Sequence, residues 1–250
     1  MQEIKKFFVE SVPARSETDF FESGSFPLAI KIKNIQKAIE KIKSVIDGII
    51  VKDIVTLQRF ETQTVAKVGD LLYLLAQSDL ISYDKLKESL KIKRIETLES
   101  LIEVLVMSGV LVKVKTYGKT YGSTRKTPKL LFVTPSLRSA VLNNIYLSGI
   151  EGKKLEDYFV LIYLKDLKSY SKYAVNLSYD LAEGGADFVL TLKDRSNIVI
   201  EVGFNKNEVE QVRNTMKKVE SRYGLVFGSS ELELINDSIV KVPLKYLLLI

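Results

Sequence analysis

Two acidic residues late in the chain have the types and spacing of a metal-dependent site that acts on phosphodiesters. Asp187 lies in the stretch GADFVL, and Glu201 interrupts the apolar stretch IVIEV. A carboxylate in such a run costs stability unless it serves something, because burial removes it from water. Two converging carboxylates could hold one Mg²⁺ or Mn²⁺ ion, since hard cations prefer oxygen ligands. We therefore predict that Asp187 and Glu201 mark a real or ancestral metal site.

The two acids can converge if the stretches that carry them form a hairpin. The predicted turn is KDRSN, residues 193–197. A register symmetrical about this turn pairs Val189 with Glu201. It then sets Asp187 opposite Gly203. Because side chains alternate with period two, the acids and residue 203 share one face, with the two carboxylates as diagonal neighbours.

Gly203 occupies the position where a lysine would complete a nuclease site. A lysine two residues after Glu201 would stabilise developing charge on a phosphate or orient a water molecule. Lys206 follows three residues after Gly203, and it could reach back only if the strand ends in a turn near Gly203. We expect an impaired site, in which any remaining activity would depend on Lys206.

The composition excludes several other kinds of chemistry. The chain of 250 residues contains no cysteine and no histidine. Disulfides, thiolate metal sites, histidine proton shuttles and Ser-His-Asp catalysis are therefore excluded. Catalysis would have to use carboxylates, lysine, tyrosine or a hard metal ion.

A basic segment at residues 112–129 gives the main signal for nucleic acid. It contains no acid, and its cations equal the formal net charge of the whole chain, +6. Concentrated positive charge favours a polyanionic partner, and tyrosines between the cations suit stacking. The candidate residues of this segment are Lys113, Lys115, Tyr117, Lys119, Tyr121, Arg125, Lys126 and Lys129.

The elements around this segment follow the winged helix-turn-helix pattern. Apolar residues at helical spacing predict a helix over 30–50 and then three shorter helices, over 64–78, 83–92 and 94–109. Ser82 is a suitable N-cap, and Gly109 is a typical terminator. Two alternating stretches, 110–118 and 130–135, then predict a two-stranded wing.

The third of these short helices is poorly suited to reading DNA. Its exposed side carries Glu96, Glu99 and Glu103, which repel phosphate. Only the residues at its start, including Lys93 and Arg94, favour contact with DNA. We expect nucleic-acid contact through the wing, with protein packing of the winged helix as the alternative.

The rest of the chain reads as an α/β domain. After a helix that follows Pro135, the patterns predict elements in the order α-β-β-β-α-β, with the second helix crossing between parallel strands. We divide the chain into a helical segment at 1–63, a winged helix-turn-helix at 64–134 and an α/β domain at 135–250.

Residues 153–230 resemble the PD-(D/E)xK nuclease-like fold, with GADFVL and IEVG standing for its acidic and E-x-K motifs. The resemblance implies that Glu156 is the helical acid of the site and that Asp187 and Glu201 are its central acids. The expected fold class is thus α/β with a helical N-terminal part, in which a winged helix-turn-helix precedes a nuclease-like domain.

The order of the motifs over most of the chain is similar to the C-terminal region of archaeal and bacterial P-loop ATPases of the AAA class. These motifs are ESGSFP, the winged helix, PKLLFVTPSLRSAV, LEDYFV and GADFVL with IEVG. The phosphate-binding pattern G-x-x-x-x-G-K-[ST] is missing, because Lys113 stands where Gly118-Lys119-Thr120 would need a preceding glycine. We therefore expect no nucleotide site in this chain, which is either part of a longer protein or a relative without the ATPase core.

Three functions remain open from the sequence. The leading one is a DNA-binding accessory module of an ATPase with a degenerate nuclease-like domain. The alternatives are a Mg²⁺- or Mn²⁺-dependent DNA nuclease that uses Glu156, Asp187, Glu201 and Lys206, and a protein-interaction scaffold. The apolar runs are shorter than the roughly 18 residues of a membrane span, and the N-terminus does not read as a secretory signal. We expect a cytoplasmic protein without a membrane partner.

Overall fold

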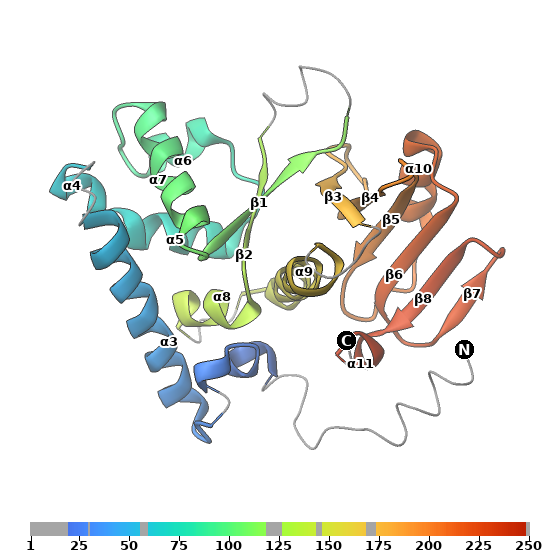
Figure 1. Ribbon diagram of the computed structural model, residues 1–250, viewed down its shortest axis with the longest axis horizontal. Helices are drawn as coiled ribbons and strands as arrows, with labels where there is room; N and C mark the ends of the chain where they lie inside the picture. The colour runs from blue at the N-terminus through green and yellow to red at the C-terminus, as the bar shows by residue number, and fades with distance from the viewer. Residues whose placement is uncertain are drawn as a thin grey trace. The chain divides into compact units, whose positions relative to one another are not determined.

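The computed structural model describes residues 20–29, 31–55, 60–118, 127–143, 147–168 and 174–248. These residues form two compact units (Figure 1). The helical unit holds the described residues of 18–114 and 127–150, and the α/β unit holds those of 115–118 and 151–250. A helical N-terminal half followed by a mixed sheet with interspersed helices confirms the predicted α/β class at this level.

Local chemistry explains several helix ends in the helical unit, although the helix predicted over 30–50 starts only at Ile35 and the one predicted over 64–78 is divided into α4 and α5. Asn34 caps α3 by accepting from the Lys37 N–H at 3.0 Å, and Ser82 caps α6 by accepting from the Lys85 N–H at 3.3 Å. Gly109, with a φ of +71°, follows the end of α7. The elements are η1 (Phe20–Gly24), η2 (Pro27–Ala29), α3 (Ile35–Ile49), η3 (Ile50–Val55), α4 (Thr62–Val65), α5 (Val68–Gln77), α6 (Tyr83–Ser89), α7 (Ile95–Met107) and α8 (Pro135–Leu142).

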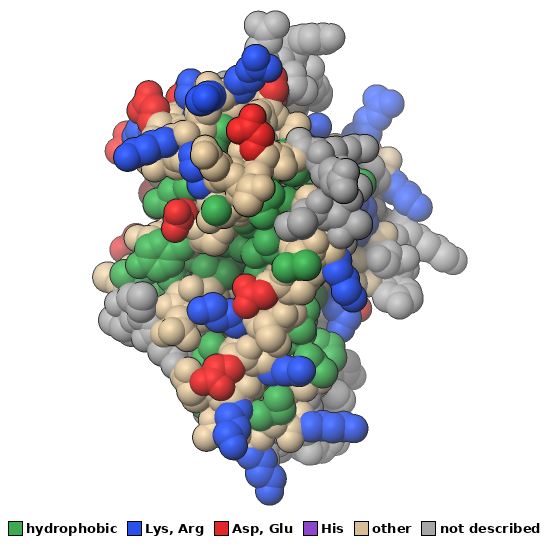
Figure 2. All heavy atoms as spheres, turned by 90° about the vertical axis from the view of Figure 1, so that its left-hand side faces the viewer, with side chains coloured by type: hydrophobic (Ala, Val, Ile, Leu, Met, Phe, Trp, Pro, Cys, Tyr) green, Lys and Arg blue, Asp and Glu red, His purple; other side chains and the backbone are tan. Residues whose placement is uncertain are grey.

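The core of the helical unit is built from the apolar faces of these helices. Ile39, Ile42 and Ile46 of α3 are buried, as their spacing predicts. Leu98, Ile102 and Leu105 of α7 join the same cluster. Figure 2 looks onto this unit and shows hydrophobic side chains across the middle of the face, with charged side chains above and below. No helix among the described residues is long and apolar enough to cross a bilayer.

The strands pair in the order β2-β1-β3-β4-β5-β6-β8-β7. The β1–β2, β3–β4, β4–β5 and β7–β8 pairs are antiparallel, and β1–β3, β5–β6 and β6–β8 are parallel. In the pair of β1 with β3, Lys115 pairs with Ser178 and Thr116 with Tyr179. The strands are β1 (Leu111–Thr116), β2 (Lys129–Phe132), β3 (Ala174–Tyr179), β4 (Phe188–Leu192), β5 (Asn197–Val202), β6 (Tyr223–Ser229), β7 (Glu233–Ile235) and β8 (Ile239–Pro243).

Helices of the α/β unit cover the two faces of its sheet. The ring of Phe159 in α9 lies 5.0 Å from Phe188 and 5.8 Å from Phe227, centroid to centroid. Val212 and Val219 of α10 instead cluster with the valines at 189, 199 and 226, which point to the other face. The helices are α9 (Ile150–Ile162), η4 (Tyr163–Lys168), α10 (Glu210–Val219) and α11 (Leu244–Leu247).

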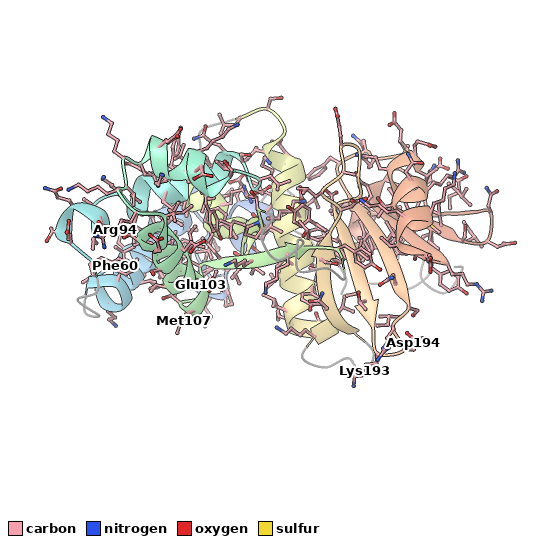
Figure 3. All side chains as sticks on the ribbon, turned by 90° about the horizontal axis from the view of Figure 1, so that it is seen from above. Phe60, Arg94, Glu103, Met107, Lys193 and Asp194 are labelled. Atoms are coloured by element: carbon pink, nitrogen blue, oxygen red, sulfur yellow. The ribbon has the colours of Figure 1, made fainter. Side chains whose placement is uncertain are left out.

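The register of the β4–β5 hairpin corrects the sequence prediction by two residues. Val189 pairs with Val199 rather than Glu201, and Thr191 pairs with Asn197. Asn197 belongs to the strand because its Nδ2 donates to the Val219 carbonyl oxygen at 3.0 Å, which shortens the turn. Figure 3 labels Lys193 and Asp194 at the tip of this hairpin. A shift of two leaves the faces unchanged, so Asp187 and Glu201 still share one.

Candidate functional site

Asp187, just before β4, and Glu201, near the end of β5, are linked by hydrogen bonds between side chain and backbone. Glu201 Oε2 accepts from the Asp187 N–H at 3.2 Å, and Asp187 Oδ2 accepts from the Val202 N–H at 2.9 Å. The corrected register brings the acids nearly opposite each other instead of diagonal. Glu201 is almost completely buried, at 3% exposure. The structure therefore brings together the two carboxylates that the sequence singled out.

Lys206 reaches back to the acids, as a lysine displaced from the E-x-K position would have to do. β5 ends at Val202, and a turn follows in which Asn205 has a φ of +50°. After this turn, Lys206 Nζ lies 2.7 Å from Glu201 Oε1. Lys206 Nζ also donates to Gln211 Oε1 at 2.7 Å. The condition set from the sequence, a turn close to Gly203, is met.

Gly203 leaves room for this arrangement. A Cβ at residue 203 would lie 3.3 Å from Lys206 Cδ, tighter than ordinary contact. The backbone of Gly203 also passes close to Gly228, where a Cβ would lie 1.9 Å from the Gly203 carbonyl oxygen. The Gly203 N–H donates to the Phe227 carbonyl oxygen at 3.0 Å. The absence of a side chain at residue 203 thus leaves space for Lys206.

Burial and the neighbouring charges shift the pKa values of Glu201 and Lys206. Burial, and then the charge of Asp187, raise the pKa of Glu201 to about 7, against the opposing effect of Lys206. Burial alone would lower the pKa of Lys206, but its hydrogen bond to Glu201 and the surrounding carboxylates outweigh this and raise that pKa. The site therefore favours the protonated form of Glu201 more than water does, and it favours the positively charged form of Lys206.

The third acid that the family resemblance implies does not join the pair. Glu156 belongs to α9, which packs against the sheet face opposite to that of Asp187 and Glu201. Within the described ranges, no three acidic side chains lie close enough to hold one metal ion together. The donor set still fits Mg²⁺ or Mn²⁺, because such ions are often held by one or two carboxylates and complete their shell with water and phosphate oxygens. A bound cation would also stabilise the deprotonated form of Glu201, whose pKa is raised by burial and by the charge of Asp187.

Sequence reasoning missed several residues that contact Lys206 or hold the loop before Asp187, namely Asp180, Gln211, Thr215 and Lys218. Three of them lie on α10, at 211, 215 and 218. That spacing sets them on one side of a helix. The sequence contains a signal for three of them, because polar residues at helical spacing follow the strand that carries Glu201.

The predicted nucleic-acid residues fall into different environments. Lys93, Arg94 and Lys115 are exposed. Lys113 is paired with Glu103 at 2.5 Å, and Lys129 is only 5% exposed, so neither offers a free ammonium group at the surface. The Tyr117 hydroxyl accepts from Asn197 Nδ2 at 3.0 Å. Lys119, Tyr121, Arg125 and Lys126 lie outside the described residues.

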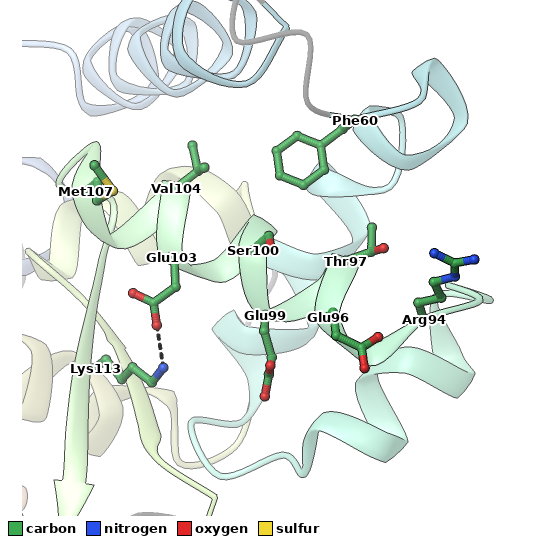
Figure 4. A pocket seen from close by; sticks show the side chains of 10 residues that line it. All are labelled: Phe60, Arg94, Glu96, Thr97, Glu99, Ser100, Glu103, Val104, Met107 and Lys113. Carbon is green, nitrogen blue, oxygen red and sulfur yellow. Dashed lines mark hydrogen bonds and ion pairs between the residues drawn. The ribbon is translucent and has the colours of Figure 1, made fainter.

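The exposed side of α7 lines a cavity of about 730 Å³ (Figure 4). Glu96 and Glu99 are among the residues that line it, and neither forms an ion pair with another described residue. Met107, at the end of the helix, is 86% exposed. This face combines negative charge with apolar surface, which suits phosphate poorly.

The comparisons with known proteins give a family and one relative. A family model described as a domain of unknown function (DUF8612) matches residues 16–148, a little over half of the chain. The chain is 30% identical over 261 residues to the uncharacterized protein MJ1637 of Methanocaldococcus jannaschii. The match covers 100% of this chain and 53% of that protein, so the chain spans about half the length of the curated relative. No solved structure matches the chain.

Proposed function

The chain belongs to the family described as a domain of unknown function (DUF8612), and from its own geometry we propose that it is a nucleic-acid-binding module with a divalent-metal site of the PD-(D/E)xK type. The single observation that carries this proposal is the 2.7 Å contact between Lys206 Nζ and Glu201 Oε1 beside Asp187. Two acids and a lysine are the minimal set for such chemistry, and here the lysine comes from the turn after the strand.

Each residue of the site has a distinct role in this proposal. Asp187 and Glu201 would hold Mg²⁺ or Mn²⁺, which supplies a Lewis acid for a phosphodiester when bound. Lys206 would contact a phosphate oxygen and stabilise charge that develops there. Glu201 binds a metal only when deprotonated, so its raised pKa makes metal affinity increase with pH up to about 7.

The nucleic-acid contact is assigned to the basic segment after β1 and to the exposed cations before α7. Three helices, α5 to α7, followed by the antiparallel pair β1–β2 support a winged helix-turn-helix. We assign α7 itself no groove-reading role, because its exposed carboxylates would repel phosphate. The order of the motifs supports an accessory module of a larger ATPase, and the chain spans about half the length of its curated relative.

Exchanging the lysine position tests the catalytic part of the proposal. We expect the protein to release heat on Mn²⁺ titration, and Asp187→Ala/Glu201→Ala to abolish that heat. Lys206→Ala removes a competing cation, so it should keep Mn²⁺ binding but lower DNA cleavage by roughly 100-fold. Gly203→Lys in the Lys206→Ala background should restore part of the cleavage, since the side chain that crowds residue 203 is then gone.

Lys193→Ala, at the exposed tip of the β4–β5 hairpin, is the matched control and should change neither binding nor cleavage. Absence of Mn²⁺ heat in the unmodified protein would refute the metal site. Cleavage that persists in Asp187→Ala would point to another site or to a contaminant.

A further inference from the structure

The α10 helix presents a polar stripe to the loop that leads into Asp187. Gln211, Thr215 and Lys218 lie at i, i+4 and i+7, while Val212 and Val219 of the same helix are buried in the core. Gln211 accepts from Lys206, and the other two contact Asp180, which directly follows β3. One helix therefore contacts both the lysine of the site and the loop of its first acid.

Asp180 organises the loop from 180 to 187. Its Oδ1 accepts from the Ala182 N–H at 3.1 Å and from Lys218 Nζ, and its Oδ2 accepts from the Thr215 hydroxyl at 3.0 Å. The loop closes so tightly on this carboxylate that a Cβ at Gly185 would lie 2.8 Å from Asp180 Cγ. The backbone there can follow its course only with glycine.

Thr215 joins this carboxylate to the backbone of the site. Its side chain is 1% exposed, and its hydroxyl donates to Asp180 while accepting from the Ala186 N–H at 3.0 Å. The next residue, Asp187, donates its own N–H to Glu201 Oε2. Hydrogen bonds from Asp180 through Thr215 thus fix the Ala186 N–H, which lies one peptide unit before the Asp187 N–H that contacts Glu201.

We propose that Asp180 and Thr215 are positioning residues, which set the backbone of Asp187 so that its carboxylate and that of Glu201 can share one cation. The inference rests on the proposed function and deepens it. Groups that orient metal ligands by hydrogen bonds commonly change metal affinity by 10–100-fold when removed. A buried hydroxyl between a carboxylate and the N–H next to a ligand residue has that kind of role.

The test compares two substitutions of one residue with a control on the same helix. Thr215→Val keeps the shape but loses both hydrogen bonds, Thr215→Ser keeps the hydroxyl, and Val219→Ala removes core methyl groups without touching the network. Mn²⁺ titration measures affinity, amide hydrogen exchange without metal measures protection of the Asp187 and Val202 N–H groups, and thermal unfolding measures stability.

We expect Thr215→Val to weaken Mn²⁺ binding at least tenfold and to expose both amides to exchange. Thr215→Ser should restore both properties, and Val219→Ala should lower the unfolding temperature while leaving affinity unchanged. Equal losses of affinity in Thr215→Val and Val219→Ala would overturn the inference, because general destabilisation would explain both.

A protein that binds no Mn²⁺ even unmodified would refute the proposed function instead. Hydrogen exchange then decides the inference separately: loss of Asp187 and Val202 protection in Thr215→Val alone supports positioning by Thr215, and unchanged protection overturns it.

Discussion

At the residue scale, the site shows how a charge can be supplied from a different position in the chain. Gly203 stands where the E-x-K motif, which this sequence resembles, has lysine, yet Lys206 Nζ lies 2.7 Å from Glu201 Oε1. The intervening turn makes this possible, because it keeps Lys206 close to Gly203: their N–H groups donate to the neighbouring carbonyl oxygens of Gly228 and Phe227. The chemical role of a residue is therefore set by where its charged atom lies, and motif spacing alone underestimates this site.

Glu201 should make the stability of the protein depend on pH. Its folded-state pKa of about 7 exceeds the ordinary 4.5, so the folded state binds the proton more tightly than the unfolded state. Below pH 4.5 the protonated carboxyl group makes its full contribution to the free energy of unfolding. This contribution is lost as the pH rises toward 7. Glu201→Gln cannot titrate, so its stability relative to the unmodified protein should rise by about 1–3 kcal/mol between pH 4.5 and 8.

Urea unfolding at pH 4.5, 6 and 8 measures this difference. Glu183→Gln is the control, because Glu183 is exposed in the loop before β4. Parallel pH profiles for Glu201→Gln and the unmodified protein would show that burial of Glu201 carries no such cost.

At the element scale, a buried arginine links two helices of the helical unit. Arg138 of α8 is 0% exposed, and its Nη2 lies 2.5 Å from Asp79 Oδ1. Its Nη1 donates to the carbonyl oxygens of Leu75 and Ala76, at 3.3 and 2.8 Å. These carbonyls lie in the last turn of α5, where a positive charge opposes the negative end of the helix dipole. The side chain thus holds α8 on the end of α5.

Removing this arginine should destabilise the helical unit strongly. Arg138→Met leaves Asp79 buried without its ion pair to Arg138, and we expect a loss of about 3–5 kcal/mol in the free energy of unfolding. Arg138→Met/Asp79→Leu should recover part of that loss, because the remaining charge is then removed as well. Chemical denaturation measures both, with Arg94→Met at the exposed start of α7 as control. A loss below about 1 kcal/mol in the single variant would contradict this account.

At the scale of the whole molecule, positive charge is unevenly distributed. The excess of +6 equals the charge of the segment 112–129 alone, whereas the exposed side of α7 carries carboxylates. The structure reduces the cations available for phosphate contact, because Lys113 is paired with Glu103 and Lys129 is buried. Nucleic-acid affinity should therefore depend most on the remaining cations of the segment, among them Lys119, Arg125 and Lys126.

Replacing these three residues with alanine should weaken DNA binding and its dependence on salt. Each lost phosphate contact reduces the slope of log affinity against log salt by about 0.9, so the triple variant should lose about 2 to 3 from the slope. Fluorescence anisotropy over a range of salt concentrations measures this. Lys37→Ala/Lys41→Ala/Lys43→Ala, which removes three exposed cations of α3, is the matched control. If the triple variant binds DNA as well as the unmodified protein, the basic segment does not contact DNA. Packing of the winged helix on a protein partner would then be favoured.

The sequence by itself determined the order and type of most elements, the cap at Ser82, and the shared face of Asp187 and Glu201. These features depend on neighbouring residues and on side-chain periodicity, so a register error of two residues did not change the predicted face. Tertiary structure alone decided the hairpin register, the approach of Lys206, the separation of Glu156 from the acids and the burial of Lys129. Each of these depends on contacts between residues far apart in the chain, such as Asn197 with Val219 or Gly203 with Gly228. Local sequence patterns reflect only neighbouring residues, so they do not predict such contacts.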